Sequence, residues 1–279
     1  MAFKSWLIRL LFLFLFVLAM SACDLAPTVS SNGTPVAGTS QGIPGGSSPS
    51  ASNVWSKVAP GVELRYEDWK SPASNEDTVT IVRFDLRKVH LMVAYQPSKP
   101  LLMSQWMQKE QAIAVINGGF FDQRHNATGL VISNGQVFGT SYQGFGGMLT
   151  VDNQGLVHLR YLSQQPYEGN EGLQQATQSS PMLVLPGGKR ANFKADAASS
   201  RRSVVAMDKQ GRLLFITSPN EAFSLDELAD LLVASDLSIN VALNLDGGSS
   251  TGLYVHAGNQ RVAIDSLAQL PIVIIVKTR

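Results

Sequence analysis

Two short segments of this 279-residue chain place polar residues and a Gly-Gly pair at the end of an apolar run. Residues 114–122 read AVINGGFFD, and residues 242–251 read ALNLDGGSST. A buried strand that stops at two glycines beside Asn and Asp puts amide donors and a carboxylate at the rim of a sheet, where a polar ligand can meet the bare main chain. The two rims together predict one shared site.

Strands are the elements that would position these segments. Alternating apolar and polar residues predict strands with one solvent-facing side at residues 78–84, 89–95 and 156–162. Nearly continuous apolar runs predict strands buried on both faces at residues 113–116, 204–207, 213–217, 239–245 and 272–276. Three glycine-containing turns typical of hairpins lie at residues 134–135, 153–155 and 209–211.

Two helices are predicted, each followed by an apolar strand that ends in one of the Gly-Gly pairs. Ser224 and Glu227 have the spacing of a capping box before an apolar face, which predicts a helix over residues 225–234. Ser104 is the expected cap of a second helix over residues 105–111. The expected fold class is therefore α+β, a single domain with a large mixed β-sheet flanked by a few helices, in which two strand-to-Gly-Gly loops form the site.

The N-terminus has the layout of an export signal. Two basic residues precede the apolar stretch 10–20, and Ser21, Ala22 and Cys23 follow it. This form is that of a bacterial lipoprotein signal, in which Cys23 is lipidated. A simple cleaved signal and an uncleaved anchor helix are the alternatives, and all three place the rest of the chain outside the cytoplasm. We expect an exported protein that is lipid-anchored in the bacterial cell envelope.

Composition divides the chain into three parts. Residues 1–22 are the predicted signal peptide, residues 23–53 a flexible Ser/Gly/Pro/Thr tether, and residues 54–279 one domain of ordinary size. The only cysteine lies at position 23, so the domain has no internal disulfide. The net charge is +1 and no basic stripe with interleaved aromatics occurs, which argues against nucleic acid as a partner.

Five motifs, in consistent order from about residue 78 to the C-terminus, resemble the phosphodiester glycosidase family. They are INGGFFD (116–122), GLVISNG (129–135), SRRSVVA (200–206), SLDELADLL (224–232) and NLDGGSS (244–250). The chain departs from the family pattern at Ser249, where many members have a third glycine, and at Ser203 and Ala206. The resemblance implies hydrolysis of a sugar 1-phosphodiester, of the N-acetylhexosamine-phosphate type, at the anomeric carbon. An envelope glycan, a glycolipid or an exopolysaccharide would carry that linkage.

Three charged residues suit this chemistry. Asp246 is the first candidate for the catalytic carboxylate, and Asp122 is the second, as acid, base or ligand orienter. Arg202, rather than its neighbour Arg201, matches the family arginine and would hold the phosphate. The alternatives to these catalytic roles are that Asp246 is a turn or cap residue and that Asp122 is a plain loop residue. The main-chain amides that would assist the arginine belong to Gly118, Gly119, Gly247 and Gly248.

Polar and aromatic neighbours complete the predicted site. Either Phe120 or Phe121 would form a sugar platform while the other enters the core, unless both are core residues. His125 would donate to phosphate. Asn117 and Asn244 would bind sugar hydroxyls or an N-acetyl group, or else would close turns. The predicted substrate-binding residues are Asn117, Gly118, Gly119, Phe120, His125, Asn244, Gly247, Gly248 and Ser249.

No cofactor is required by these residues. The chain lacks an HExxH motif or a paired His/Cys spacing that would select zinc. A calcium or magnesium ion held by Asp122 and Asp246 stays open but is not indicated. The expected partners are a glycan or sugar-phosphate substrate and, through the lipid, a membrane. A non-catalytic glycan-binding lipoprotein is the alternative function, and a lipid-tethered scaffold is a third.

Overall fold

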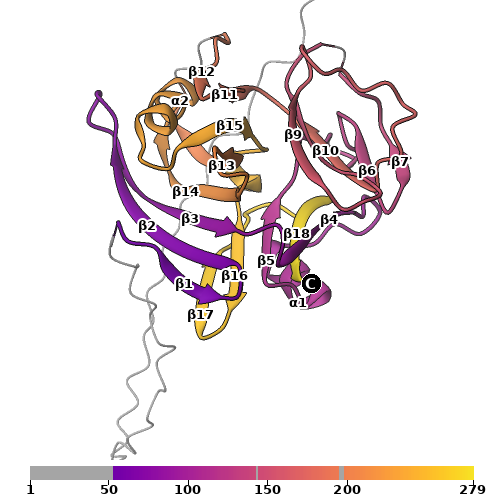
Figure 1. Cartoon of the computed structure of the whole chain (residues 1–279), viewed down its shortest axis with the longest axis horizontal. Coiled ribbons are helices and arrows are strands. Elements are labelled where there is room, and N and C mark those ends of the chain that lie inside the picture. Colours follow the sequence, from indigo (N-terminus) through magenta and orange to yellow (C-terminus); the bar gives the residue numbers. More distant parts are fainter. Residues whose placement is uncertain (1–52, 143, 195–197) are drawn as a thin grey trace, which may run out of the picture. The chain divides into compact units, whose positions relative to one another are not determined.

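Three antiparallel β-sheets form most of the folded region (Figure 1). The first contains, in spatial order, β1 (Ser56–Ala59), β2 (Val62–Lys70), β3 (Glu76–Phe84), β14 (Leu213–Phe223), β13 (Ser200–Asp208), β15 (Ile239–Asn244), β11 (Met182–Leu185) and β12 (Lys189–Arg190). The second contains β7 (Gln136–Phe138), β6 (Val131–Ser133), β10 (Gln175–Ser179), β8 (Gly147–Val151) and β9 (Val157–Tyr161). The third contains β17 (Gln260–Ile264), β16 (Leu253–Ala257), β5 (Ala114–Asn117), β18 (Ile272–Thr278) and β4 (Val89–Tyr95).

The expected single large mixed sheet is therefore wrong. Across the described residues, every pair of neighbouring strands is antiparallel. Short hairpin turns join many of these pairs, and a hairpin can only produce antiparallel neighbours. The mostly-β character with few helices agrees with the structure.

The structure is a computed structural model, and it describes residues 53–142, 144–194 and 198–279. The predicted signal peptide, the lipidation site Cys23 and the tether up to residue 52 lie outside the described residues. In the part of the chain that is described, no helix is long and apolar enough to cross a membrane.

The main hydrophobic core lies where side chains of the three sheets meet. Phe84 and Phe215 come from the first sheet, Leu149 from the second, and Ile116 and Ile274 from the third, and all five are buried. The Phe84 and Phe215 rings meet edge to face, with centroids 5.0 Å apart. Burying each such side chain contributes roughly 1.5–3 kcal/mol, so this core is what holds the sheets together.

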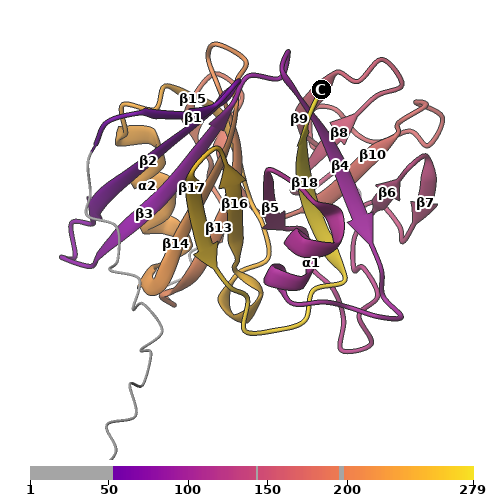
Figure 2. The ribbon, with the colours of Figure 1, turned by 90° about the horizontal axis from the view of Figure 1, so that it is seen from below.

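The two helices cover sheet faces that would otherwise be open. Helix α2 (Leu225–Ala234) packs Leu228 and Leu232 on the first sheet. Helix α1 (Met103–Glu110) packs Trp106 on the third sheet, next to β5 and β18 (Figure 2). Strand β3 has buried apolar side chains on both faces, with Val82 and Phe84 in the main core and Val79 and Ile81 in the cluster that also contains the α2 residues. The predicted solvent-facing side of residues 78–84 is therefore wrong.

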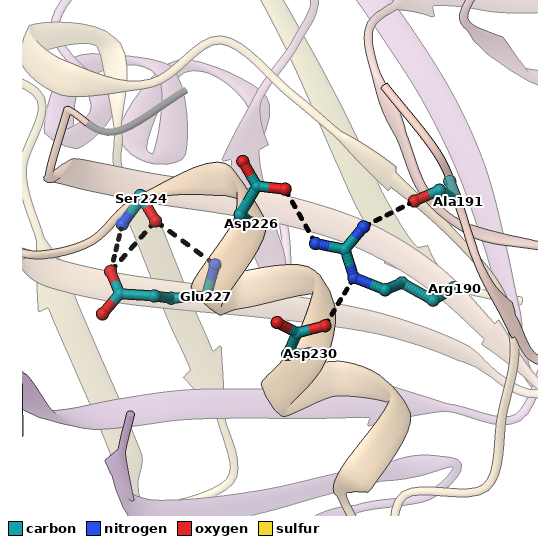
Figure 3. A network of polar contacts seen from close by, with 6 residues as sticks. All are labelled: Arg190, Ala191, Ser224, Asp226, Glu227 and Asp230. Carbon is teal, nitrogen blue, oxygen red and sulfur yellow. Dashed lines mark hydrogen bonds and ion pairs between the residues drawn. The ribbon is translucent and has the colours of Figure 1, made fainter. Parts of the chain in front are cut away.

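The start of α2 has the predicted capping box. Ser224 Oγ accepts a hydrogen bond from the Glu227 amide at 3.2 Å, and the Glu227 carboxylate accepts one from the Ser224 amide at 3.0 Å (Figure 3). The Arg190 guanidinium, from β12, forms ion pairs with Asp226 and Asp230 on the exposed side of the same helix (Figure 3). Both α2 boundaries agree with the sequence prediction.

Helix α1 begins two residues earlier than predicted, and Ser104 is not its cap. The Met103 amide donates to Ser266 Oγ at 3.2 Å, and the Ser104 amide donates to Asp265 Oδ1 at 3.2 Å. The acceptors of the Met103 and Ser104 amides therefore come from a loop 161–163 residues away, whereas Gln105 Oε1 accepts the Leu102 amide locally at 3.0 Å. Local sequence contains no signal for such a cap.

The three predicted hairpin turns are present. Asn134 and Gly135 join β6 to β7, and both have positive φ, 51° and 76°. This pair of left-handed residues is the geometry that two-residue hairpin turns require. Gly155 and Gly211, with φ of 80° and 75°, serve the β8–β9 and β13–β14 turns.

Candidate active site

The two Gly-Gly segments lie in direct contact. Asn117 Nδ2 donates to the Asp246 carbonyl at 2.6 Å, and the Asp246 amide donates to the Gly118 carbonyl at 3.1 Å. The Gly252 amide donates to Asn117 Oδ1 at 3.2 Å. Asn117 ends β5 in the third sheet, whereas Asp246 follows β15 in the first. The side chain of Asn117 thus ties the first Gly-Gly segment to main-chain groups 129 and 135 residues away, which is a long-range contact and not the closure of a local turn.

The end of β10, from the second sheet, forms a third side of the site. The Gly119 amide donates to Thr177 Oγ1 at 3.2 Å. A Cβ atom at Gly119 would lie well inside 3.0 Å of the Gln178 carbonyl oxygen, so only glycine fits this approach. On the other side, Asn244 Nδ2 donates to the Ser180 carbonyl at 2.9 Å. Strand β10 was not predicted from the sequence, although one strand end from each sheet builds the site.

Asp246 is half-buried at the start of the second Gly-Gly pair. Burial raises the pKa of Asp246, and hydrogen bonds from the Ser250 hydroxyl and the Gly247 amide oppose this rise. The Gly247 amide lies 3.0 Å from Asp246 Oδ1. Ser250 belongs to the short 3-10 helix η1 (Gly248–Ser250), whose middle residue Ser249 is exposed. A carboxyl group with a raised pKa beside amide donors suits proton transfer as well as charge stabilisation.

Arg202 places a buried positive charge next to the loop that contains Asp246 and Gly247. Its Nε donates to the Phe223 carbonyl at 3.0 Å, and its Nη2 donates to the Ala198 carbonyl at 2.7 Å. A Cβ atom at Gly247 would lie 3.8 Å from Arg202 Nη1, so the guanidinium is adjacent to the turn that follows Asp246. The structure therefore brings Asp246, Gly247 and Arg202 together.

Arg201 has a role in the site region that the sequence did not reveal. Its Nε donates to the Pro219 carbonyl and its Nη2 to the Asp265 carbonyl, each at 2.9 Å. The loop after Asp265 donates two main-chain hydrogen bonds to the Ser249 carbonyl, from Leu267 and Ala268. Arg201 thus braces the loop that holds η1. In the sequence, Arg201 and Arg202 are simply adjacent, so nothing there shows that Arg202 lies beside Gly247 whereas Arg201 holds the loop after Asp265.

Asp122 lies in a loop that its own carboxylate closes. Asp122 Oδ1 accepts hydrogen bonds from the Arg124 and Asn126 amides, both at 2.8 Å. Hydrogen bonds from Asn126 and Arg124 hold the pKa of Asp122 below its usual range. Within the described residues, no hydrogen bond joins Asp122 to Asp246. These contacts agree with the plain loop alternative, and a catalytic role for Asp122 stays a prediction.

The aromatic residues after the first Gly-Gly pair divide between core and surface. Phe121 packs against two buried clusters and stacks on the His125 ring, with centroids 5.9 Å apart. Phe120 is half-buried, and its carbonyl accepts a hydrogen bond from the Thr128 amide at 3.0 Å. Phe120 therefore remains the candidate for sugar contact, whereas Phe121 supports the loop. His125 has a left-handed main chain, with φ of 64°.

A metal site is not evident from side-chain clustering. Among the described residues, no group of three or more His, Cys, Asp or Glu side chains is placed to hold an ion. The carboxylates of Asp122 and Asp246, which the sequence left open as ligands, lie in separate hydrogen-bonded loops.

Comparison with known proteins agrees with this architecture. A family model described as phosphodiester glycosidase matches residues 110–277, more than half of the chain. The chain is 18% identical to the catalytic domain of zebrafish N-acetylglucosamine-1-phosphodiester alpha-N-acetylglucosaminidase, a structure auto-inhibited by its pro-peptide; the match has a TM-score of 0.62 and covers 80% of this chain and 85% of that one. A hypothetical protein from Synechocystis is 17% identical with a TM-score of 0.56, over 79% of this chain and 62% of that one. No curated protein matches the chain. At these identities, the structural matches show a shared fold.

Proposed function

Because this chain belongs to the phosphodiester glycosidase family, we propose that it hydrolyses a sugar 1-phosphodiester of the N-acetylhexosamine type at the site formed by its two Gly-Gly loops. One observation carries the assignment of the site. The Asn117 side chain and the Gly118 carbonyl bond to the main chain of Asp246, which fixes a half-buried carboxyl group where the two Gly-Gly segments meet.

Asp246 is the proposed catalytic carboxylate. In the reaction, the bond between the anomeric carbon and the phosphate oxygen breaks, and water supplies the oxygen that replaces it. Positive charge develops at the anomeric carbon, which an ionised Asp246 would stabilise, and the same group can accept the proton of the attacking water. A phosphate is a good leaving group, so the site needs little help from a strong general acid.

Arg202 is the proposed phosphate-side residue. The leaving phosphate keeps both electrons of the broken bond, so a fixed positive charge beside it lowers the barrier. The carbonyls of Phe223 and Ala198 orient the Arg202 guanidinium next to Gly247 before substrate arrives. The amides of Gly118, Gly119 and Gly247 already donate to the Ile272 carbonyl, Thr177 Oγ1 and Asp246 Oδ1, so the expected nest of four glycine amides is wrong. The Gly248 amide is the proposed main-chain donor to the phosphate oxygens.

The test is release of free N-acetylglucosamine from its methyl 1-phosphodiester by the full-length protein in detergent. We expect Asp246→Asn and Arg202→Ala to reduce kcat by at least about 100-fold, as loss of a catalytic group or charge stabiliser does. Full activity of Asp246→Asn would overturn the assignment. Saturable binding without release, in the unmodified protein, would instead favour a non-catalytic glycan-binding protein.

A matched control separates the two readings of Asp122. Asp152 closes the β8–β9 turn in the same manner, with its Oδ1 accepting from the Gln154 and Leu156 amides at 2.8 and 2.9 Å. If Asp122 takes part in the reaction, Asp122→Asn lowers kcat far more than Asp152→Asn does. Equal and small effects would leave Asp122 with a loop-closing role alone.

The proposed location is the bacterial cell envelope, with the domain anchored by a lipid on Cys23. The proposal is supported by the N-terminal sequence, where Ser21 and Ala22 precede Cys23 after an apolar stretch. Growth with labelled palmitate is expected to label the unmodified protein but not Cys23→Ser. Equal labelling of both proteins would contradict the anchor.

A further inference from the structure

Two aromatic rings stack on each other in the segment between β7 and β8. The Tyr142 and Phe145 ring centroids lie 4.9 Å apart, with 28° between the ring planes. Tyr142 is half-buried, whereas the Phe145 side chain is 50% exposed. An exposed aromatic ring that is stacked on an ordered neighbour presents a flat apolar face that a ligand can cover.

Tyr142 is held in place by two hydrogen bonds. Its hydroxyl lies 2.7 Å from Thr128 Oγ1, and its amide donates to Gln178 Oε1 at 3.0 Å. A Cβ atom at Gly129 would lie 3.1 Å from Tyr142 Cζ, so the ring packs directly against Gly129. Phe145 thus stacks on a ring that is already ordered, which reduces the entropy lost when a ligand binds.

The segment that contains the ring pair is attached to the end of β10, which also contacts both Gly-Gly segments. Gln178, which holds Tyr142, also approaches Gly119 through its carbonyl oxygen. Gly146, next to Phe145, packs closely on the main chain of Ser179. The next residue, Ser180, accepts the hydrogen bond from Asn244, two positions before Asp246. Both ends of the aromatic segment are therefore fastened to β10, whose end contacts both Gly-Gly segments of the candidate active site.

We infer that Tyr142 and Phe145 form a platform for a sugar ring that flanks the scissile linkage of the substrate. Residues 139–146 contain no charged side chain, so the platform suits a neutral ring and not the phosphate itself. A pyranose offers an apolar C–H face to stack on Phe145 and edge hydroxyls to reach nearby polar groups such as Thr128 and Tyr142. The inference rests on the proposed function, because it assigns a further subsite of the same substrate.

The experiment compares substrates that differ only in a flanking sugar. The probes are N-acetylglucosamine methyl 1-phosphodiester and two extended forms, one with a hexose on the phosphate in place of methyl and one with a second N-acetylglucosamine on the sugar. We expect Phe145→Ala to raise KM about tenfold for one extended probe and to leave kcat and the methyl probe within about twofold. Phe145→Trp, which keeps a flat ring, is expected to restore the lower KM.

Leu156→Ala is the matched control. Leu156 is 52% exposed, belongs to the turn at the other end of β8, and so measures the general effect of removing an exposed apolar side chain from the same sheet. Equal changes for all three probes, or no change with Phe145→Ala, would overturn the platform while leaving the proposed reaction intact.

Direct binding of the probes, measured by calorimetry, keeps the two proposals apart. If the unmodified protein turns over no probe but binds one extended probe about tenfold more weakly after Phe145→Ala, the platform is supported and the reaction is not. If the unmodified protein binds the extended probes no better than the methyl probe, the platform is refuted. Phe145 is exposed, so neither of its variants is expected to disturb folding.

Discussion

Substituting Gly119 with alanine tests the geometry that brings the three sheets together. The added Cβ atom would lie inside the 3.0 Å limit that real Cβ atoms respect, with the Gln178 carbonyl oxygen as its neighbour. It would also lie 3.2 Å from the carbonyl carbon of Gln178 and 3.3 Å from Thr177 Oγ1. The obstacle is main chain of a strand that pairs on both sides, so no rotamer change can relieve it.

The expected loss in the free energy of unfolding is about 2 kcal/mol. Overpacking a core costs about 1–3 kcal/mol, and Gly119→Ala should cost about 3 kcal/mol because the obstacle is main chain that cannot move aside. Replacing glycine with alanine restricts the unfolded chain, which returns about 0.4–1 kcal/mol. Urea denaturation followed by circular dichroism should show a lower midpoint with an unchanged slope, and activity should fall because the Gly119 amide must move.

Gly211→Ala is the control for this experiment. Gly211 has open space around its Cβ position but a left-handed φ of 75°, so alanine there is strained without a clash. Left-handed strain of about 1–2 kcal/mol, less the same gain from the unfolded chain, leaves a loss of about 1 kcal/mol. If Gly119→Ala proves no more destabilising than Gly211→Ala, the close approach of the two strand ends is not what requires glycine.

Three further predictions concern single side chains. Burial raises the pKa of Asp246 above 3.8, so the folded state binds the proton of this carboxyl group more tightly than the unfolded state does, and stability falls as pH rises from 3.8 through the folded-state pKa. Asp246→Asn should therefore be more stable than the unmodified protein at pH 7. This advantage should disappear near pH 3, which unfolding measured at both pH values will test. The Ser71 hydroxyl, with other donors, lowers the pKa of Glu227 from 4.5 to about 2, so the stabilisation by ionised Glu227 is present above pH 4.5 and disappears toward pH 2. Glu227→Gln should lower the free energy of unfolding by about 1 kcal/mol at pH 7. A loss that persists at pH 2 would show that the ionised carboxylate is not its source. Trp106→Phe removes the 2.8 Å hydrogen bond from Nε1 to the buried Leu270 carbonyl and should cost about 2 kcal/mol in urea denaturation, whereas a cost below about 0.5 kcal/mol would show that the bond matters little.

Features encoded by neighbouring residues were predictable from the sequence. The capping box of Ser224 and Glu227, the Asn134-Gly135 turn and the apolar strands β5, β15 and β18 each depend on a pattern only a few residues long. The family assignment also followed from short motifs in a fixed order. Such features need no knowledge of what the rest of the chain does.

Strand β10 shows why the rest was not predictable. Its sequence, QATQS, is polar, yet all five residues are buried. Gln175 Oε1 accepts the Val93 amide at 3.0 Å, and Thr177 Oγ1 accepts the Gly119 amide at 3.2 Å, so these side chains satisfy main-chain donors of distant segments. Hydropathy assigns such residues to the surface because it cannot foresee the donors that make their burial favourable.

The candidate site combines both kinds of information. The two Gly-Gly rims were predicted to meet, and the 129-residue separation between Asn117 and Asp246 is closed by one hydrogen bond. The distinct positions of Arg201 and Arg202 followed only from the partners that each one finds across the sheet. Long-range partners depend on the packing of three sheets, which no local pattern specifies.

The contacts that close the site suggest how a family of this kind can change its substrates. Several of them join main-chain atoms alone: the Asp246 amide to the Gly118 carbonyl, the Gly118 amide to the Ile272 carbonyl, and the Asn244 amide to the Pro181 carbonyl. Main-chain bonds survive when side chains in the surrounding loops are replaced. Substitutions can therefore change the side chains around the reacting bond one at a time, while the main-chain hydrogen bonds that close the site are retained.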